Sequence, residues 1–178
     1  MKKYLVIGNP IEHSLSPTLH NFWLKQCSID AVYEKKLLEK KNLKDIIDDV
    51  RNDKISGINV TVPFKKSIIP FLDKLSNEAK KTQSVNTISK INNEICGDNT
   101  DTRGFDHSLN QLNYKVEGKK AFIIGAGGVT SSIILALESL GVLKIFISNR
   151  TKQKAENLKT LFNNLNIIDW GDIPNFDM

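Results

Sequence analysis

The stretch Ala121-Phe122-Ile123-Ile124-Gly125-Ala126-Gly127-Gly128-Val129-Thr130 decides how the second half of this chain folds. Its four apolar residues predict a buried strand, and its glycines predict a tight turn that opens a helix over residues 127–140. Glycine lets the backbone approach a phosphate closely, and a helix N-terminus supplies N–H donors and a partial positive charge. The pattern therefore favours a dinucleotide site, with a tight turn that holds no ligand as the alternative. The residues expected to form it are Gly125, Ala126, Gly127, Gly128 and Val129.

The next predicted strand, 143–149, ends in Ser148-Asn149, and Arg150 and a lysine-bearing helix follow. Many NAD-binding folds have an acidic residue near this point, which binds the ribose 2′-hydroxyl. An arginine can instead bind a 2′-phosphate through two hydrogen bonds, and Lys152 and Lys154 add positive charge. The pattern predicts NADP rather than NAD, with a capped helix start and solvated lysines as the alternative. The residues predicted to contact this part of the cofactor are Asn149, Arg150, Thr151 and Lys154.

Strands at 119–125 and 143–149, helices at 127–140 and 151–165, and a third strand at 166–168 make up this half. They correspond to the first half of a doubly wound nucleotide-binding fold. We therefore expect an incomplete Rossmann-type domain. Because residues 169–178 show no obvious terminating element, we expect a truncated protein or a fragment, and we expect the fragment to be inactive.

Toward the N-terminus, strands alternate with helices, which predicts an α/β substrate-binding domain with a mainly parallel sheet. Strands are expected at 4–8, 31–38, 57–62, 85–90 and 94–97. Helices are expected from Ser16-Pro17 to Cys27 and at 43–50, 64–72, 77–82 and 102–112. The predicted domains are 1–101, for substrate binding and catalysis, and 102–178, for NADP binding.

Composition excludes several classes of protein. The chain has 178 residues, of which 40% are hydrophobic and 25% charged, as in soluble globular proteins. The net charge of +5 comes from lysines interspersed with acids, which argues against a nucleic-acid interface. No apolar run is long enough for a membrane span or a signal peptide. Cys27 and Cys96 have neither disulfide nor metal-ligand spacing, so we expect reduced, buried thiols in a cytoplasmic protein.

Polar residues gather at predicted strand ends in the first half. Ser14 and Ser16 stand two apart before a helix, although Ser16 alone could be its N-cap. Thr61 and Lys65 flank Pro63 where a strand ends, and open α/β sheets bind ligands at the carboxyl ends of their strands. Lysines in isolation are usually only surface charges.

Three more polar residues follow. Asn86 and Asn99 offer amides, and Asp101 offers a carboxylate that could also cap the linking helix. Hydroxyls, amides, one ammonium and one carboxylate suit a small acidic substrate with several hydroxyls, held next to a dinucleotide.

In order and combination, these segments resemble the shikimate dehydrogenase family. The matching stretches are 8–21, 56–65, 84–87, 97–105, 125–128 and 149–151. The resemblance implies reversible reduction of 3-dehydroshikimate to shikimate with NADPH, in the chorismate pathway of aromatic amino-acid biosynthesis, without a metal. It implies that Lys65 is the catalytic acid/base paired with Asp101. It also implies substrate binding by Ser14, Ser16, Thr61, Lys65, Asn86 and Asp101.

The sequence departs from the family at Thr102-Arg103 and at Thr130-Ser131-Ser132, and it has no counterpart of the family's C-terminal part. A quinate/shikimate dehydrogenase and a non-catalytic, truncated ligand-binding module remain as alternatives. The sequence also leaves open whether the protein forms a homodimer. No membrane or nucleic-acid partner is expected.

Overall fold

The computed structural model describes residues 1–178, which divide into two compact units, Met1–Asn99 and Thr100–Met178. This division falls two residues before the predicted domain boundary at residue 101, which stays a prediction. Each unit has its own hydrophobic core, so each is described separately.

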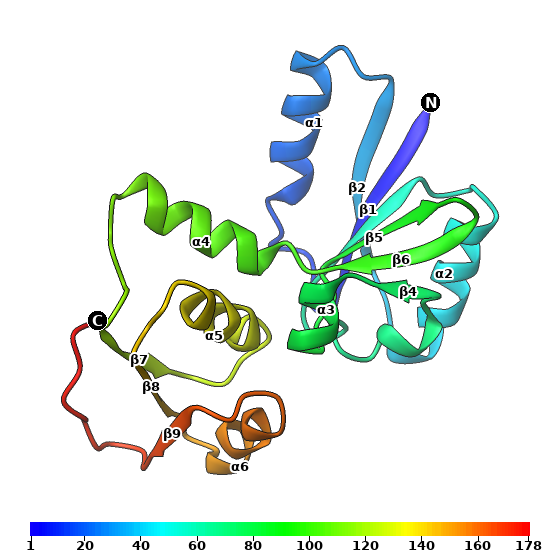
Figure 1. Ribbon diagram of the computed structural model, residues 1–178. Helices are drawn as coiled ribbons and strands as arrows, with labels where there is room; N and C mark the ends of the chain where they lie inside the picture. Colours follow the sequence, from blue (N-terminus) through cyan, green and yellow to red (C-terminus); the bar gives the residue numbers. More distant parts are fainter. The chain divides into compact units, whose positions relative to one another are not determined.

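The first unit contains one mixed sheet of six strands in the order β2-β1-β3-β5-β6-β4 (Figure 1). Three of the five strand pairings are parallel, so the predicted mainly parallel α/β sheet is confirmed. Asn92 and Asn93 both have positive φ, at 50° and 67°, which is the backbone of a tight hairpin between β5 and β6. The strands are β1 (Lys2–Gly8), β2 (Ala31–Leu37), β3 (Gly57–Val60), β4 (Lys74–Leu75), β5 (Thr87–Ile91) and β6 (Glu94–Asp98).

Both faces of this sheet bury apolar side chains, because successive residues of β1 face opposite sides. Leu5 and Ile7 join the core beneath α2 (Leu43–Arg51), whereas Val6 packs with Tyr33 on the other side. Helix α2 has apolar residues at helical spacing, and all of them are buried: Leu43, Ile46, Ile47 and Val50.

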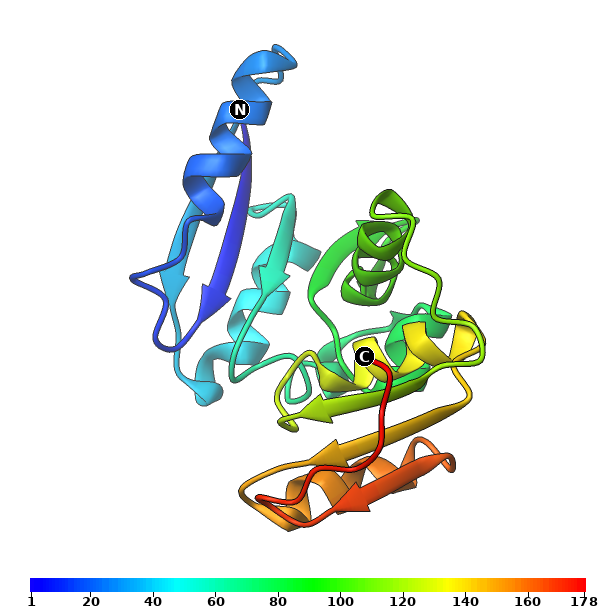
Figure 2. The ribbon, with the colours of Figure 1, turned by 90° about the vertical axis from the view of Figure 1, so that its left-hand side faces the viewer.

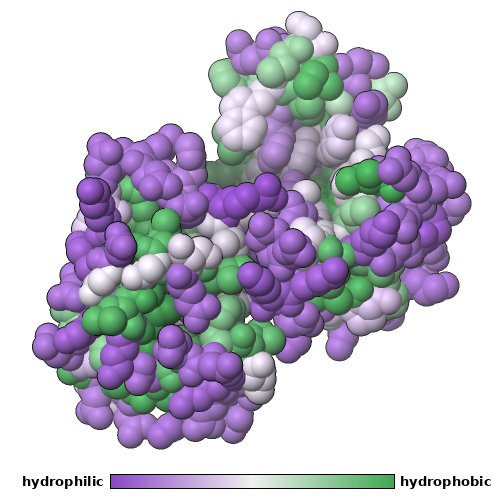
Figure 3. Space-filling view, in the orientation of Figure 1, coloured by the Kyte–Doolittle hydropathy of each residue, from purple (hydrophilic) through white to green (hydrophobic).

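Helix α1 (Ser16–Gln26) differs from α2, because none of its residues is fully buried. It packs against β2 and leaves Leu19, Phe22 and Trp23 about half exposed. Figure 3 shows apolar side chains among polar ones over this helix.

One predicted helix is wrong. Residues 64–72 form consecutive turns and a short 3-10 helix, Ile69–Phe71, rather than an α-helix. Pro70 lacks the backbone N–H that a continuous helix would need there. Phe64 and Ile68 are nevertheless buried, so the segment is fixed by core packing. The helix predicted at 77–82 is confirmed as α3 (Asn77–Thr82), capped by the Ser76 hydroxyl.

The second unit has three parallel strands in the order β7-β8-β9 (Figure 2). Its elements are β7 (Lys120–Ile124), β8 (Lys144–Ser148), β9 (Leu165–Ile168), α4 (Asp101–Gln111), α5 (Thr130–Ser139) and α6 (Lys152–Glu156). The predicted third strand is confirmed. The predicted helix 151–165 is wrong beyond Glu156, where a 3-10 turn, Asn157–Thr160, takes over.

The C-terminal residues of the second unit return to β7. Asp177 donates its backbone N–H to Lys120 O at 2.8 Å, and Phe122 donates to Met178 O at 2.8 Å. Figure 2 shows this last segment, in red, running back past the sheet. The outer edge of β7 is therefore partly hydrogen-bonded.

Two expectations from composition can be compared with the structure. No helix combines the length and the apolar character needed to cross a bilayer. Both cysteines are free, but Cys27 is exposed and Cys96 is half-buried, so the predicted burial is wrong for Cys27. It lies at the C-terminal end of α1, a helix that contributes no buried residue to the core.

Candidate functional site

The first candidate site lies where β1 and β3 end. Thr61 donates its backbone N–H to Ile7 O at 2.9 Å, and Asn9 donates to Val62 O at 3.0 Å, so the two connections run side by side. Gly8 is needed for this approach, because a Cβ there would lie 2.7 Å from the Thr61 methyl carbon. Parallel strands thus place Thr61 next to the loop that carries Ser14.

A hollow of about 290 Å³ opens between these two connections. It is lined by Val6, Pro10, Ile11, His13, Ser14, Ser16 and Thr61. The structure therefore brings three of the predicted substrate-binding hydroxyls together over an apolar floor. The sequence analysis did not single out His13, which directly precedes Ser14 in the chain and also lines the hollow.

The start of α1 leaves the serine hydroxyls in this loop. Ser14 Oγ accepts from the backbone N–H of Ser16 at 3.4 Å. The N-cap of α1 is Leu15, and no side chain caps the helix. The alternative interpretation of Ser16 as an N-cap is therefore wrong, while Pro17 occupies the first turn as predicted.

Backbone hydrogen bonds connect the segments that carry Lys65 and Asn86. Val85 donates to Lys65 O at 2.8 Å, and Val60 donates to Asn86 O at 2.8 Å. Lys65 follows β3 in the first turn after Pro63 and is half-buried, and Asn86 directly precedes β5. Thr61, Lys65 and Asn86 therefore belong to two chain segments that are bonded to each other along their length.

Asn99 and Asp101 have different surroundings. Asn99 is fully buried, and its amide donates to Thr82 Oγ1 at 3.1 Å and Ser84 O at 2.9 Å. The expectation that Asn99 contacts substrate is therefore wrong, because burial commits its amide to the interior. Asp101 is the first residue of α4, whose N-cap is Thr100, so Asp101 is not the cap. Its pairing with Lys65 stays a prediction.

The glycine turn of the second unit has room for a ligand. Gly125 has φ of +111°, a conformation that side chains rarely adopt. A Cβ on Gly127 would meet nothing within 4 Å, so the turn leaves open space above its backbone. The ten-residue helix α5 begins directly after it, at Thr130. Space and the positive end of a helix fit the pyrophosphate of a dinucleotide.

Two side chains brace this turn from below. Thr130 Oγ1 accepts from the Gly127 N–H at 2.9 Å. Asn149 Oδ1 accepts from the Ala126 N–H at 2.9 Å, while its Nδ2 donates to Thr151 O at 2.7 Å. Asn149 thus ties the turn to the segment after β8. The predicted contact of Asn149 with the cofactor stays a prediction.

The basic residues after β8 are not equivalent. Lys152 donates to Asp169 Oδ1 at 2.6 Å, and this hydrogen bond raises the pKa of Lys152. Its charge is therefore partly offset by a neighbouring carboxylate. Arg150 and Thr151 follow the end of β8 and Lys154 lies in α6, and all three are exposed.

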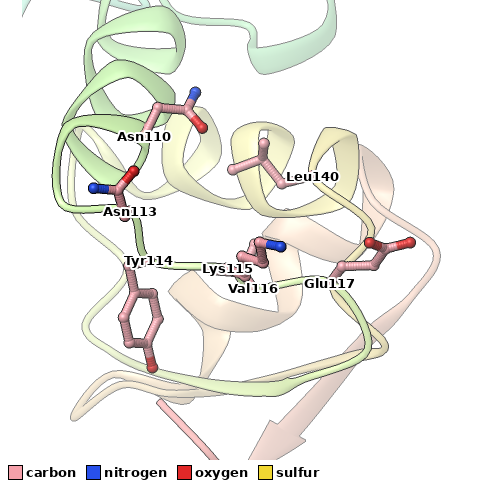
Figure 4. A pocket seen from close by; sticks show the side chains of 7 residues that line it. All are labelled: Asn110, Asn113, Tyr114, Lys115, Val116, Glu117 and Leu140. Atoms are coloured by element: carbon pink, nitrogen blue, oxygen red, sulfur yellow. The ribbon is translucent and has the colours of Figure 1, made fainter.

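A second hollow, of about 320 Å³, lies elsewhere in this unit (Figure 4). It is lined by Asn110, Asn113, Tyr114, Lys115, Val116, Glu117 and Leu140. Leu140 follows the end of α5, about 15 Å along the helix from the glycine turn at 1.5 Å per residue. None of the predicted site residues lines this hollow.

Comparison with known proteins matches both units to one family. Residues 6–88 match the family model for the shikimate dehydrogenase substrate binding domain, and residues 108–175 match that for shikimate / quinate 5-dehydrogenase. A shikimate dehydrogenase (NADP(+)) of Pelagibacter ubique is 56% identical over 177 residues. The alignment covers 99% of this chain and 67% of that protein.

Solved structures give the same match. The crystal structure of a shikimate dehydrogenase from Aquifex aeolicus is 40% identical with a TM-score of 0.87, over 94% of this chain and 62% of that one. A shikimate 5-dehydrogenase from Thermus thermophilus, solved in complex with NADP(H) and shikimate, is 32% identical with a TM-score of 0.85, over 94% and 63%. The chain thus spans about two thirds or somewhat less of the length of these relatives. On this similarity, the chain belongs to the shikimate dehydrogenase family.

Proposed function

We propose that the full-length protein catalyses the reversible, NADPH-dependent reduction of 3-dehydroshikimate to shikimate. The observation that carries the proposal is the hollow in which Ser14, Ser16 and Thr61 meet, next to the segment that carries Lys65. Three hydroxyls over an apolar floor suit a small ring that carries several hydroxyls and a carboxylate.

Lys65 is proposed as the catalytic acid. Reduction of a ketone places negative charge on its oxygen, and a nearby ammonium stabilises that charge and donates the proton. NADPH, when bound, supplies the hydride. Lys65 Nζ then holds the proton that reaches the carbonyl oxygen, and in the reverse direction it takes the proton from the alcohol. Asp101 is proposed to orient the ammonium and to accept from a substrate hydroxyl.

Substrate orientation falls to the remaining polar residues of the first unit. Ser14 and Ser16 come from the loop before α1, Thr61 from the end of β3, and Asn86 from the start of β5. Because these groups arrive from separate elements, they can fix the ring in one orientation rather than merely bind it.

The second unit is proposed to bind NADP. Gly125, Ala126, Gly127, Gly128 and Val129 form the turn over which the pyrophosphate would lie. Arg150, with Thr151 and Lys154 beside it, would bind the 2′-phosphate, and Asn149 would support both segments. The relative from Pelagibacter ubique, a shikimate dehydrogenase (NADP(+)), supports this choice.

A direct experiment is steady-state oxidation of shikimate with NADP⁺ by the full-length protein. We expect saturable turnover, and we expect Thr61→Val to raise the KM for shikimate about tenfold, the loss of one good hydrogen bond. Ser67→Ala removes a hydroxyl that only bonds locally to Phe64 O, and it should change neither constant. Absence of any turnover with shikimate would refute the proposal.

Quinate is a second candidate substrate, because the model matched by residues 108–175 describes shikimate / quinate 5-dehydrogenases. The same assay with quinate decides the point. We expect kcat/KM for shikimate to exceed that for quinate, and the opposite ranking would make quinate the substrate.

We also infer a cytoplasmic enzyme, supported by two free cysteines and no disulfide. A homodimer is the remaining proposal, and sedimentation of the full-length protein at several concentrations tests it.

A further inference from the structure

Four polar side chains form a continuous hydrogen-bonded chain in the first unit. Tyr33 Oη donates to Asn59 Oδ1 at 2.7 Å. Asn59 Nδ2 lies 3.2 Å from Thr87 Oγ1, and Thr87 Oγ1 donates to Asn86 Oδ1 at 3.0 Å. The chain therefore begins at a buried tyrosine and ends at the amide proposed to bind substrate.

Strand register explains how these residues meet. Asn59 on β3 pairs directly with Thr87 on β5, so their side chains share one face of the sheet. Tyr33 on β2 is two strands away from Asn59, and its long side chain spans the intervening β1. Alternation along the strands thus places Tyr33, Asn59 and Thr87 on the same side, and Asn86 directly precedes Thr87 in the chain.

A backbone carbonyl fixes the direction of this chain. Asn59 Nδ2 also donates to the backbone O of Asn86 at 3.2 Å. A carbonyl oxygen can only accept, so a flipped Asn59 amide would bring two oxygens together. The amide nitrogen of Asn59 must therefore face Asn86 O and Thr87, and its oxygen must face Tyr33.

The remaining hydrogen bonds of the chain agree with that constraint. Burial raises the pKa of Tyr33 to about 12, so its hydroxyl keeps its proton and donates to Asn59. Thr87 Oγ1 accepts from Asn59 and has only one hydrogen, which goes to Asn86 Oδ1. The Asn86 amide therefore turns its oxygen toward Thr87 and its Nδ2 to the other side.

The tyrosine end of the chain is held in place. The His20 ring stacks on Tyr33 with centroids 4.2 Å apart and planes within 4°. The Asn21 side chain accepts from Tyr33 N at 2.9 Å and donates to Tyr33 O at 2.8 Å. Tyr33 itself is 4% exposed, so water has little access to this end.

We propose that Asn59 and Thr87 are positioning residues that fix the Asn86 amide as a donor toward the substrate. The substrate atom at Asn86 is then an acceptor, such as a ring hydroxyl oxygen. This inference rests on the proposed function only in that Asn86 contacts the substrate. Asn59 and Thr87 act through Asn86 and have no contact with the reacting atoms in this scheme.

The first test compares Thr87→Val with Thr87→Ser in the full-length protein. The valine removes the hydroxyl at similar size, so the KM for shikimate should rise about tenfold while kcat and the KM for NADPH change less than twofold. The serine keeps the hydroxyl and should restore wild-type constants. Ser89→Ala, two residues along the same strand face, is the matched control and should be unchanged.

Equal KM values in a folded Thr87→Val variant and the wild type would overturn the positioning role. Failure of Thr87→Ser to restore the KM would overturn it too, because packing rather than the hydroxyl would then matter. Loss of kcat and KM for both substrates together would indicate a general structural defect and would also contradict the proposal.

A second measurement reads the direction of the chain without turnover. In ¹⁵N-labelled protein, Thr87→Val should shift one Asn59 Nδ2 proton upfield, because that proton loses its acceptor. A shift of an Asn86 Nδ2 proton instead would mean that the chain runs the other way and would refute the proposed polarity. If the wild type turned over neither shikimate nor quinate, the proposed function would fail, and these spectra would still decide the polarity.

Discussion

The two units present their candidate sites in opposite ways. In the first unit, side chains form the site, and hydrogen bonds such as Thr87 to Asn86 set their direction. In the second unit, the backbone forms the site, and side chains such as Asn149 brace it from below. A site formed by the backbone needs open space and suitable dihedral angles. A site formed by side chains needs hydrogen-bonding or charged groups at particular positions. Substitutions in the two units should therefore change different kinetic constants.

The largest effect should come from Lys65→Ala. Removing a proton-transfer group typically costs a factor of about 10²–10⁴ in rate, so kcat should fall by that order. The dissociation constant for NADPH, measured by fluorescence titration, should stay within about twofold because Lys65 lies in the other unit. Lys66→Ala, at the exposed neighbouring position, is the matched control. Wild-type kcat in Lys65→Ala would end its catalytic role.

Arg150→Ala should come second and should change cofactor constants alone. Hydrogen bonds to a charged group contribute about 1.5–3 kcal/mol, so the KM for NADPH should rise roughly 10- to 100-fold. The KM for NADH and for shikimate should stay unchanged. Lys159→Ala, another exposed cation of the second unit, serves as the control. An unaltered preference for NADPH over NADH would remove the 2′-phosphate argument.

The glycine turn allows binding and folding to be separated within the second unit. Gly127→Ala points a methyl group into open space, so thermal stability should hold while the dissociation constant for NADPH rises about tenfold or more. Gly125→Ala forces a side chain into a φ of +111° and should destabilise the unit by about 1–3 kcal/mol. Thermal melts and titrations of both variants would show the contrast. Identical behaviour of the two would mean that the turn does not approach the cofactor.

The smallest effect should lie outside both sites, at the pair of Arg51 and Asp73. Arg51 makes two hydrogen bonds to Asp73, at 2.8 and 3.0 Å, and these lower the pKa of that carboxyl, helped by the Ile95 N–H. Because the pKa of Asp73 is lowered in the folded protein, its carboxylate stabilises the fold at pH values above the ordinary pKa of an aspartate, about 4. This contribution disappears as the pH falls through the folded-state pKa.

Asp73→Asn should therefore lower the melting temperature slightly at neutral pH, and the gap to wild type should close on acidification. Surface ion pairs contribute little to the free energy of unfolding, so the decrease should be small. Kinetic constants should not change, because the pair lies outside both candidate sites. Glu39→Gln, at an exposed carboxylate that pairs with Lys41 outside both sites, is the control and should leave the melting temperature at neutral pH close to that of the wild type. A gap that widened toward low pH would contradict the assignment.

Sequence reasoning was successful where one local signal sufficed. The apolar spacing of α2 and the glycine turn after β7 could be identified because period and turn chemistry are local properties. It failed for residues 64–72, where buried Phe64 and Ile68 imitate helical spacing within consecutive turns. It also missed β4, since two residues leave no periodicity to detect.

In the candidate site, too, local sequence patterns predicted some residues correctly and failed for others. Ser14, Ser16 and Thr61 were predicted as a set and line one hollow, because strand ends bring them together. Asn99 looked equally suitable in sequence but points into the core, where Thr82 and Ser84 hold it. The direction of an amide depends on partners far away in the chain, such as the pairing of Asn59 with Thr87, and no local pattern encodes it.

The most direct test of the whole account is NADPH consumption by the full-length protein when 3-dehydroshikimate is added. One NADPH should be oxidised for each molecule of shikimate formed, with NADH a much poorer donor. No consumption above the background without 3-dehydroshikimate, in a folded protein that still binds NADPH, would contradict it.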